Sequence, residues 1–353
     1  MQFYPLQVKA LDKSTEGSTI VTFDVDKEII EQFKFTQGQY LNIKADHKGN
    51  EIRRSYSLCS SPLDNEIKIG VREVEGGVFS TYVNHELKTG DTLQVAPPSG
   101  QFFVDIEPKT KRHIIAFAAG SGITPILSMI KTHLVLESKT TIQLFYFNKT
   151  VSSIMFKEEL EALKNQHLQR FEIFHFLTQE HRALDLFNGR LSEDKLHLIM
   201  EQLCSKGSVD EVFVCGPKPM MFLIRDTLTE RGIDRKNIHF ELFGDPNPTK
   251  SEVNTTNYEG KMSDVLIHEG GKTFKLKMNQ GQSRILDEAL KASSDLPFAC
   301  KGGVCCTCKA KLIKGTVDMH VNYALEEDQV NDGYILTCQA IPTSDELEID
   351  FDG

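Results

Sequence analysis

The sequence predicts a multidomain chain: an antiparallel β-barrel, then an α/β domain on a parallel sheet, then a small α+β module. Three observations lead to this prediction. The spacing of apolar residues changes near residue 105, residues 244–261 have the composition of a linker, and five of the eight cysteines fall after residue 262. A length of 353 residues fits two or three domains.

Residues 1–105 alternate short β-rich runs with turns. The runs are STIVTFDV, QYLNIKA, EIKIGVREV and DTLQVAP. Because few long helical patterns separate them, we expect a small antiparallel barrel in this segment.

Residues 106–243 instead alternate strands with helices. Apolar runs rich in β-branched and aromatic residues occur at HIIAFAAG, TIQLFYF, FEIFHFL, EVFVCG and NIHFELF. Helical spacing is found in three sets: Ile126, Met129, Ile130 and Leu134; Phe156, Leu160 and Leu163; and Met221, Ile224 and Leu228. Nearly continuous apolar strands between helices predict a doubly wound parallel sheet.

The last part of the chain is a separate module. Residues 244–261 are rich in Pro, Gly and small polar residues and are expected to form an exposed linker. Residues 262–353 mix strands (SDVLIHE, TFKLKM) with one short helix, which starts near Ser283 and carries Ile285, Leu286, Ala289 and Leu290 on one face.

Four cysteines of this module have the spacing of an iron–sulfur site. Cys300, Cys305 and Cys308 form C-x4-C-x2-C, and Cys338 follows after 29 intervening residues. This is the plant-type 2Fe–2S spacing. Zinc is the alternative, although a zinc ribbon would usually add a second C-x2-C. Cys306 breaks the spacing and is interpreted as a small residue that fills space.

Two loops of the α/β domain have features of a dinucleotide site. Gly120, Gly122, Thr124 and Pro125 follow the first parallel strand and open a helix, where glycines let a pyrophosphate approach the helix N-terminus. Cys215-Gly216-Pro217 lies at a second strand–helix junction. A plain turn and a buried thiol are the alternatives.

The predicted barrel carries two further motifs. Arg54, Tyr56 and Ser57 lie in the stretch RRSYSLCSS, which combines a cation for a diphosphate with an aromatic ring for a flavin face. Gly76, Gly77 and Ser80 form a phosphate-sized turn at an expected helix start. Each could also be a polar strand or an ordinary turn.

With these motifs together, the sequence resembles the ferredoxin–NADP reductase superfamily with a C-terminal plant-type ferredoxin. The resemblance implies an FAD domain (1–105), an NAD(P) domain (106–243), a linker (244–261) and a β-grasp 2Fe–2S domain (262–353). It implies that Arg54 holds the FAD diphosphate, that Tyr56 packs on the isoalloxazine and that Ser57 hydrogen-bonds near flavin N5.

The resemblance also implies roles for the remaining motif residues. Gly76, Gly77 and Ser80 would bind the FAD phosphates, and Val71 and Arg72 would lie beside the flavin. The glycine loop and Cys215-Gly216-Pro217 would flank the nicotinamide and pyrophosphate. Glu241 and Phe243 would lie near the flavin, although Phe243 could equally be a core residue.

The expected function is electron transfer from NAD(P)H through FAD and the cluster to an oxygenase component. Ser57, Cys215 and Glu241 are the candidates for the hydride step. Lys149, with no acidic residue beside it after the second parallel strand, favours NADPH over NADH. A solvated lysine is the alternative.

Within the superfamily, the sequence is similar to reductases that serve phenylacetyl-CoA epoxidation, through RRSYSLCSSP, FYFNKTVSSIMFKEEL and HFELF. Reductases of ketosteroid 9α-hydroxylation are the alternative within the family. The resemblance implies a di-iron, multi-subunit oxygenase as partner. A self-contained flavin reductase and a redox sensor are alternatives from other classes.

The charge and the apolar runs of the sequence exclude some classes of partner. A net charge of −10 argues against nucleic acid, and no apolar run is long enough to span a membrane, so we expect a cytoplasmic protein with reduced cysteines. Nine acidic residues and no basic one lie between Glu326 and the C-terminus. They are either a solvated face or a docking surface for an electropositive partner.

Overall fold

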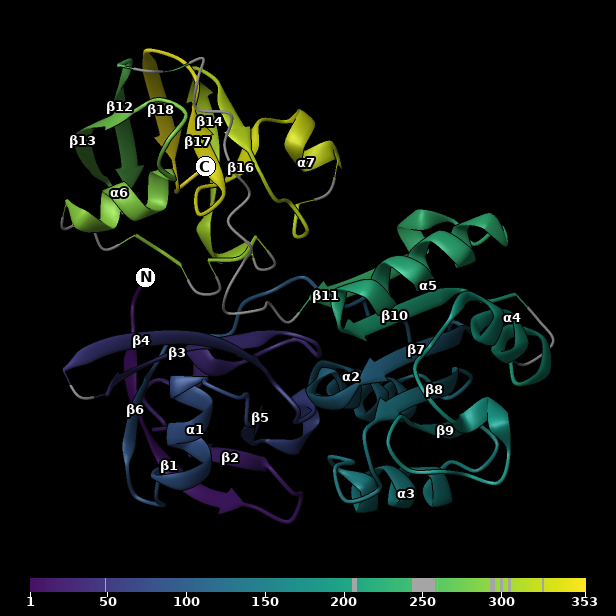
Figure 1. The fold of residues 1–353 in the computed structure, drawn as a ribbon. Coiled ribbons are helices and arrows are strands. Elements are labelled where there is room, and N and C mark those ends of the chain that lie inside the picture. The colour runs from purple at the N-terminus through teal and green to yellow at the C-terminus, as the bar shows by residue number, and fades with distance from the viewer. Residues whose placement is uncertain are drawn as a thin grey trace. The chain divides into compact units, whose positions relative to one another are not determined.

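The computed structural model describes residues 1–47, 49–204, 208–242, 258, 260–292, 296–298, 301–303, 306–325 and 327–353. The chain divides into two compact units, Gln2–Phe243 and Gly244–Gly353, the second of which also includes Met1. The first unit holds the barrel and the parallel sheet, and the second holds the cysteine-rich module (Figure 1).

An antiparallel six-stranded sheet with the order β4-β3-β6-β1-β2-β5 forms the N-terminal part. Its strands are β1 (Tyr4–Asp12), β2 (Ser18–Asp24), β3 (Tyr40–His47), β4 (Asn50–Ser57), β5 (Ile67–Arg72) and β6 (Thr92–Val95), and one helix, α1 (Val78–His85), follows β5. A bridge between Leu58 and Ile69 joins the end of β4 to β5 and closes the sheet into the expected barrel. Side chains that alternate along the strands fill its core, among them Leu41, Ile43 and Val71.

The α/β part is a five-stranded parallel sheet with the order β11-β10-β7-β8-β9. Its strands are β7 (His113–Ala119), β8 (Thr141–Asn148), β9 (Phe171–Leu177), β10 (Glu211–Gly216) and β11 (Ile238–Leu242), and its helices are α2 (Ile123–Leu136), α3 (Lys157–Gln166), α4 (Glu193–Gln202) and α5 (Lys218–Glu230). Helices cover both faces of the sheet (Figure 1), which is why its strands are apolar on both sides. The helix α4 had no counterpart among the sequence patterns.

The second unit contains a five-stranded mixed sheet with the order β13-β12-β18-β14-β16 and a two-stranded sheet β15-β17. The elements are β12 (Met262–Glu269), β13 (Lys272–Asn279), α6 (Ile285–Lys291), β14 (Lys309–Lys314), β15 (Val317–Met319), α7 (Glu327–Asn331), β16 (Tyr334–Leu336), β17 (Ala340–Pro342) and β18 (Glu346–Asp350). The short helix expected near Ser283 is α6, and its buried Ile285, Leu286 and Ala289 belong to the core of this unit.

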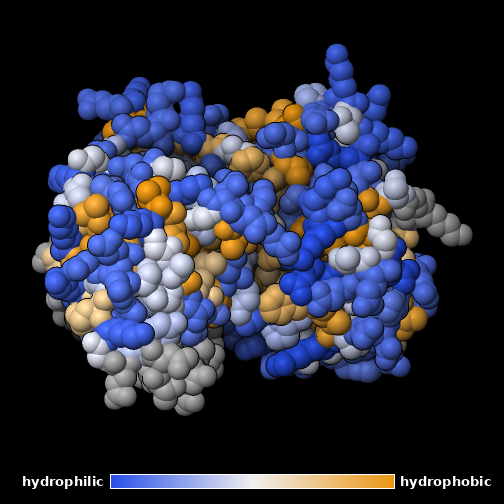
Figure 2. Space-filling view, turned by 90° about the horizontal axis from the view of Figure 1, so that it is seen from above, coloured by the Kyte–Doolittle hydropathy of each residue, from blue (hydrophilic) through white to orange (hydrophobic). Residues whose placement is uncertain are grey.

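Hydrophilic side chains dominate the surface seen in Figure 2, where the hydrophobic residues lie in small separate groups. Among the described residues, no helix is both long and apolar enough to cross a membrane.

The amino edge of the parallel sheet is held by one buried carboxylate. Glu137, directly after α2, accepts hydrogen bonds from the Glu107 backbone N–H (2.8 Å) and from Thr140 Oγ1 (2.6 Å). Arg112 Nη2 lies 3.2 Å from Glu137 Oε1. Burial opposes ionisation, but the bonds from His133, Thr140 and Glu107 outweigh it and lower the pKa of Glu137 to about 2.

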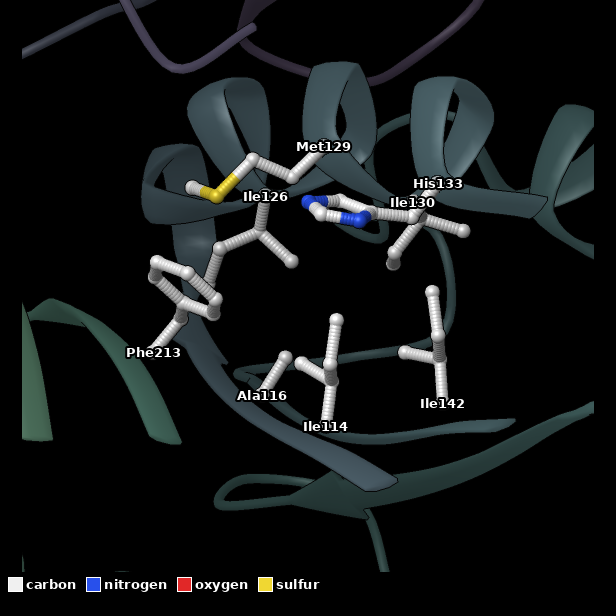
Figure 3. A pocket seen from close by; sticks show the side chains of 8 residues that line it. All are labelled: Ile114, Ala116, Ile126, Met129, Ile130, His133, Ile142 and Phe213. Carbon is white, nitrogen blue, oxygen red and sulfur yellow. The ribbon is translucent and has the colours of Figure 1, made fainter. Parts of the chain in front are cut away.

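A small cavity lies beside this cluster, between α2 and the sheet. Its volume is about 10 Å³, and it is lined by aliphatic side chains of α2, β7 and β8 and by the rings of His133 and Phe213 (Figure 3). A space of this size is at the lower limit for a single water molecule. It lies toward the strand amino ends, opposite the edge at which ligands bind to such sheets.

We expect Glu137→Gln to lower the free energy of unfolding by about 2 kcal/mol at neutral pH, because a buried charge-assisted network loses its anion. Since folding lowers the pKa from 4.5 to about 2, the difference from wild type should shrink as the pH falls through this range. Urea unfolding of both proteins against pH measures it. The exposed Glu161→Gln is the control, and a deficit independent of pH would contradict the assignment.

Candidate functional site

The face of β4 near its end presents the cation and the ring expected to hold a flavin. Arg54 and Tyr56 are two residues apart on the strand and therefore share a face. The ring centroids of Tyr56 and Phe79 are 5.4 Å apart, and burial raises the pKa of the Tyr56 hydroxyl. Arg54 Nη1 donates to the Arg53 carbonyl, whereas Arg53 itself pairs with Glu51. The two arginines of the motif therefore make different contacts, and Arg54 is the one on the same face as Tyr56.

The N-terminus of α1 offers backbone donors close to this face. Gly76 has a φ of +73°, and Gly77 is the N-cap and provides no capping side chain. Ser80 Oγ accepts from Val74 N (3.1 Å) and donates to the Gly77 carbonyl (3.1 Å), so it shapes the turn. Uncapped N–H groups beside a glycine turn fit an anionic diphosphate.

Val71 and Arg72 end β5 with different orientations. The Val71 side chain is fully buried in the barrel core, so only its backbone is available to a cofactor on this strand. The Arg72 guanidinium reaches the α/β domain instead: a Cβ placed on Gly120 would lie 2.9 Å from Arg72 Nη1. Arg72 therefore places a cation from the barrel beside the glycine loop.

The glycine loop lies between β7 and α2 as expected. Gly120 has a φ of +54°, and its carbonyl accepts a hydrogen bond from Tyr146 Oη at 3.0 Å. Thr124 Oγ1 donates to the Ser121 carbonyl (2.9 Å) at the start of α2. The first turn of this 14-residue helix has no side-chain cap. Its N–H groups and positive dipole end fit a pyrophosphate.

Three predicted hydride-site residues come together where β10 and β11 end. Cys215 pairs with Glu241 in the parallel register, and Ser57 Oγ of the barrel donates to Glu241 Oε2 at 2.8 Å. A Cβ on Gly122 would lie 2.1 Å from the Cys215 carbonyl oxygen, so only glycine fits there. A Cβ on Gly216 would lie 3.0 Å from the Ala119 Cβ, which is a tight contact, and Pro217 is the N-cap of α5. Phe243 lies outside the described residues.

Burial sets the protonation of this cluster. It raises the pKa of the Cys215 thiol well above its ordinary value, so this thiol is neutral at physiological pH. Burial also raises the pKa of Glu241 to about 7, against the opposing hydrogen bond from Ser57. Ser57 and Glu241 can therefore exchange donor and acceptor roles near neutral pH, which is typical of functional carboxyls.

Cys308 and Cys338 come together through strand pairing. The antiparallel pairing of β14 with β16 sets Lys309 opposite Leu336, and Thr337 N donates to the Cys308 carbonyl at 3.1 Å. Both cysteines are buried, and Gln339 Nε2 lies 3.6 Å from Cys338 Sγ. Two thiols at neighbouring strand ends fit two of the four ligands of a 2Fe–2S cluster.

The other two predicted ligands, Cys300 and Cys305, lie outside the described residues. Within the described ranges alone, no three His, Cys, Asp or Glu side chains gather into a metal-binding group. Cys306 Sγ donates to the Ala324 carbonyl at 3.2 Å, which agrees with its interpretation as a residue that is not a ligand. Gly303 has a φ of +73°, and a Cβ there would meet the Val321 carbonyl at 2.8 Å.

The structure adds an acidic residue to the expected ribose end of the site. Lys149 is exposed after β8, as predicted. Glu180, which follows β9, accepts a hydrogen bond from Val151 N at 2.6 Å and so lies beside the Lys149–Val151 turn. The sequence interpretation considered only residues next to Lys149 in the chain. It missed Glu180 because this carboxylate reaches the Lys149–Val151 turn through the parallel pairing of β8 with β9.

Much of the acidic C-terminal segment is used within its own domain. Glu346 pairs with Lys314, and Glu348 Oε1 lies 3.0 Å from His268 Nε2. Asp352 accepts hydrogen bonds from the backbone of Gly270 and Gly271. These contacts tie three of the nine acidic residues to other parts of their own domain, while the Glu346 side chain stays 65% exposed.

Three family models match successive parts of the chain. Residues 5–104 match the oxidoreductase FAD-binding domain, residues 117–226 the oxidoreductase NAD-binding domain, and residues 267–343 the 2Fe-2S iron-sulfur cluster binding domain. One component of the 1,2-phenylacetyl-CoA epoxidase of Escherichia coli is 37% identical over 99% of this chain and 98% of that protein.

Two further matches extend over nearly the whole chain. The ferredoxin reductase component of 3-ketosteroid-9-alpha-monooxygenase from Rhodococcus rhodochrous is 32% identical over 98% of this chain and 96% of that protein. The solved structure of phthalate dioxygenase reductase superposes with a TM-score of 0.62 at 24% identity, covering 99% of this chain and 98% of that one, and supports the fold.

Fold and site together define an oxidoreductase that uses NAD(P)H, FAD and a 2Fe–2S cluster. The chain belongs to the ferredoxin–NADP reductase family, in the group of oxygenase reductases that carry a C-terminal 2Fe–2S domain. The three predicted cofactors and the three fold classes are thereby confirmed. The similar proteins include a ferredoxin reductase component of a ketosteroid monooxygenase and a reductase subunit of glycine betaine monooxygenase, which supports the predicted oxygenase partner.

Proposed function

We propose that this protein is the reductase of a phenylacetyl-CoA epoxidation system, with a di-iron, multi-subunit oxygenase as electron acceptor. The observation that carries the proposal is the identity of 37% to the E. coli epoxidase component along practically the entire length of both chains. The lower identity of 32% to the ketosteroid monooxygenase reductase makes that system the second candidate. A cytoplasmic location belongs to the same proposal.

Within this function, the residues of the chain have distinct tasks. Bound FAD would supply the link between a nicotinamide, which gives two electrons as a hydride, and a 2Fe–2S cluster, which takes one electron at a time. Arg54 and the α1 N-terminus would hold the FAD diphosphate, and the glycine loop with Arg72 would hold the nicotinamide pyrophosphate. Ser57 and Glu241 share a hydrogen bond whose donor can be either group, depending on whether Glu241 is protonated. Cys215 packs beside them as a neutral thiol.

The proposal is tested with the purified holoenzyme and two purified oxygenases. With phenylacetyl-CoA and the epoxidase oxygenase, NADPH consumption should be coupled to epoxide formation, and the ketosteroid oxygenase should support far slower turnover with its substrate. Reduction of cytochrome c measures electron output without either oxygenase. Efficient coupling to the ketosteroid oxygenase alone would assign the second candidate instead.

The proposal includes NADPH as the preferred donor, with Lys149 as the residue that recognises the 2′-phosphate. Lys149→Ala should raise KM for NADPH about tenfold, because one charge-assisted hydrogen bond is lost, and should leave KM for NADH unchanged. Steady-state reduction of ferricyanide with each nucleotide measures this, with the exposed Lys164→Ala as control. An unchanged KM for NADPH would indicate that Lys149 is only solvated. Glu180 would then be the candidate for contact with the ribose.

A further inference from the structure

A buried polar contact joins the barrel to α2 some distance from the hydride site. Ser128 Oγ donates to the Ser60 carbonyl at 2.6 Å, and Ser61 Oγ lies 2.9 Å from Thr132 Oγ1. The Thr132 hydroxyl donates to the Ser128 carbonyl at 2.7 Å, so Ser61 is the donor to Thr132. All four residues are at most 2% exposed. Buried hydroxyl bonds of this kind require one relative position of the two elements.

A lysine adds a charged contact at the edge of the same surface. Lys131 Nζ donates to Asp64 Oδ2 of the barrel at 2.5 Å and to Glu159 Oε1 of α3 at 2.8 Å. Asp64 Oδ2 also accepts from Ser61 N at 2.9 Å, which fixes the 3-10 turn Pro62–Asp64. Burial lowers the pKa of Lys131, but the bonds to the two carboxylates outweigh it and raise it. The ammonium is therefore charged, and only its Asp64 arm crosses between the domains.

Short, ordered segments connect this contact to the nucleotide site on both sides. Ser60 is three residues after Ser57, the hydroxyl that donates to Glu241. Ser128 is one helical turn after Thr124, at the start of the helix that follows the glycine loop. A shift between the barrel and α2 would therefore move Ser57 and the glycine loop apart by a similar amount.

We propose that Ser60, Ser61 and Asp64 of the barrel and Ser128, Lys131 and Thr132 of α2 form a latch that sets the distance between the two halves of the hydride site. Lys131 is a positioning residue in this latch and touches neither cofactor. The latch concerns the hydride step that the family performs, and it holds whichever oxygenase receives the electrons.

The two arms of Lys131 supply a matched pair of variants. Asp64→Asn removes the charge across the domain boundary, and Glu159→Gln removes the charge within the α/β domain. In anaerobic stopped-flow experiments with the holoenzyme, Asp64→Asn and Lys131→Met should lower the limiting rate of flavin reduction by NADPH about tenfold, because small misplacements of reacting groups are costly. Glu159→Gln should behave as wild type, and Lys131→Arg should restore most of the rate.

Further measurements distinguish positioning from a general loss of stability. The FAD content, the dissociation constant for NADPH and the rate of electron transfer from dithionite-reduced FAD to the cluster should be unchanged in Asp64→Asn. Amide hydrogen exchange should rise in residues 58–65 and 123–136 in Asp64→Asn and stay at the wild-type level in Glu159→Gln. Thr132→Val, which removes a hydroxyl without changing its volume much, should reproduce both effects.

Two results would overturn the latch. The first is an unchanged limiting rate in both Asp64→Asn and Thr132→Val. The second is an equal loss of rate in Asp64→Asn and Glu159→Gln, since that would assign the effect to the charge of Lys131 and not to the contact between the domains.

Discussion

Serine in place of Cys308 or Cys338 will abolish the visible absorption of the 2Fe–2S cluster and electron transfer to the oxygenase. Both cysteines are buried at the ends of paired strands, where a serine hydroxyl replaces a thiolate ligand poorly. Flavin reduction by NADPH should continue in both variants, because the nucleotide motifs belong to the other compact unit. Absorption spectra and ferricyanide reduction separate the two functions.

Cys306→Ser is the matched control for this experiment. The Cys306 thiol is two residues from Cys308 and donates to the Ala324 carbonyl, so its replacement should leave cluster content at the wild-type level. The same result should hold for Cys305→Ser only if Cys305 is not a ligand, which the spacing argues against. Loss of the cluster in Cys306→Ser with retention in Cys305→Ser would reverse the ligand assignment.

The second large effect is expected at the hydride step. Ser57→Ala should slow anaerobic flavin reduction by NADPH about 100-fold, because a preorganised hydroxyl donor is removed from the site. The Ser57 hydroxyl donates to the Glu241 carboxylate when Glu241 is ionised. When Glu241 is protonated, its own proton can bond to Ser57 Oγ, and the serine hydroxyl is free to donate toward the flavin.

This exchange gives the step a pH dependence with a defined sign. Because burial raises the pKa of Glu241 to about 7, the reduction rate should fall as the pH rises through about 7. The glutamine of Glu241→Gln donates an amide N–H to Ser57 at every pH. The reduction rate of this variant should therefore be independent of pH and close to the rate of the wild type at low pH. An unchanged profile in Glu241→Gln would exclude Glu241 from the step, and a wild-type rate in Ser57→Ala would exclude Ser57.

Local patterns predicted the fold class because the strands of the parallel sheet are apolar runs that can be recognised in short segments. The runs HIIAFAAG and TIQLFYF are apolar almost without interruption, as strands covered on both faces must be, and they became β7 and β8. The helix α4 was missed although Leu196, Ile199, Met200 and Leu203 have helical spacing, and Leu196 and Ile199 are buried.

In the candidate site, features set by short segments were predicted, whereas contacts between distant residues were not. Glycines at Gly120 and Gly122 were visible in the sequence because a loop that needs a positive φ or a close approach leaves this mark. The bond between Ser57 and Glu241 spans 184 residues, and no pattern predicts its length or its effect on the carboxyl. Likewise, Glu180 became a neighbour of the Lys149 turn only through the pairing of β8 with β9.

The three modules, their cofactor classes and the four cysteines proposed to hold the cluster could be predicted from sequence, because ligand spacing and glycine turns are properties of short segments. Only the folded chain shows that Ser57 and Glu241 share a hydrogen bond and how α2 is held against the barrel. Those properties depend on burial and on contacts between residues far apart in the chain, and both exist only after the chain has folded.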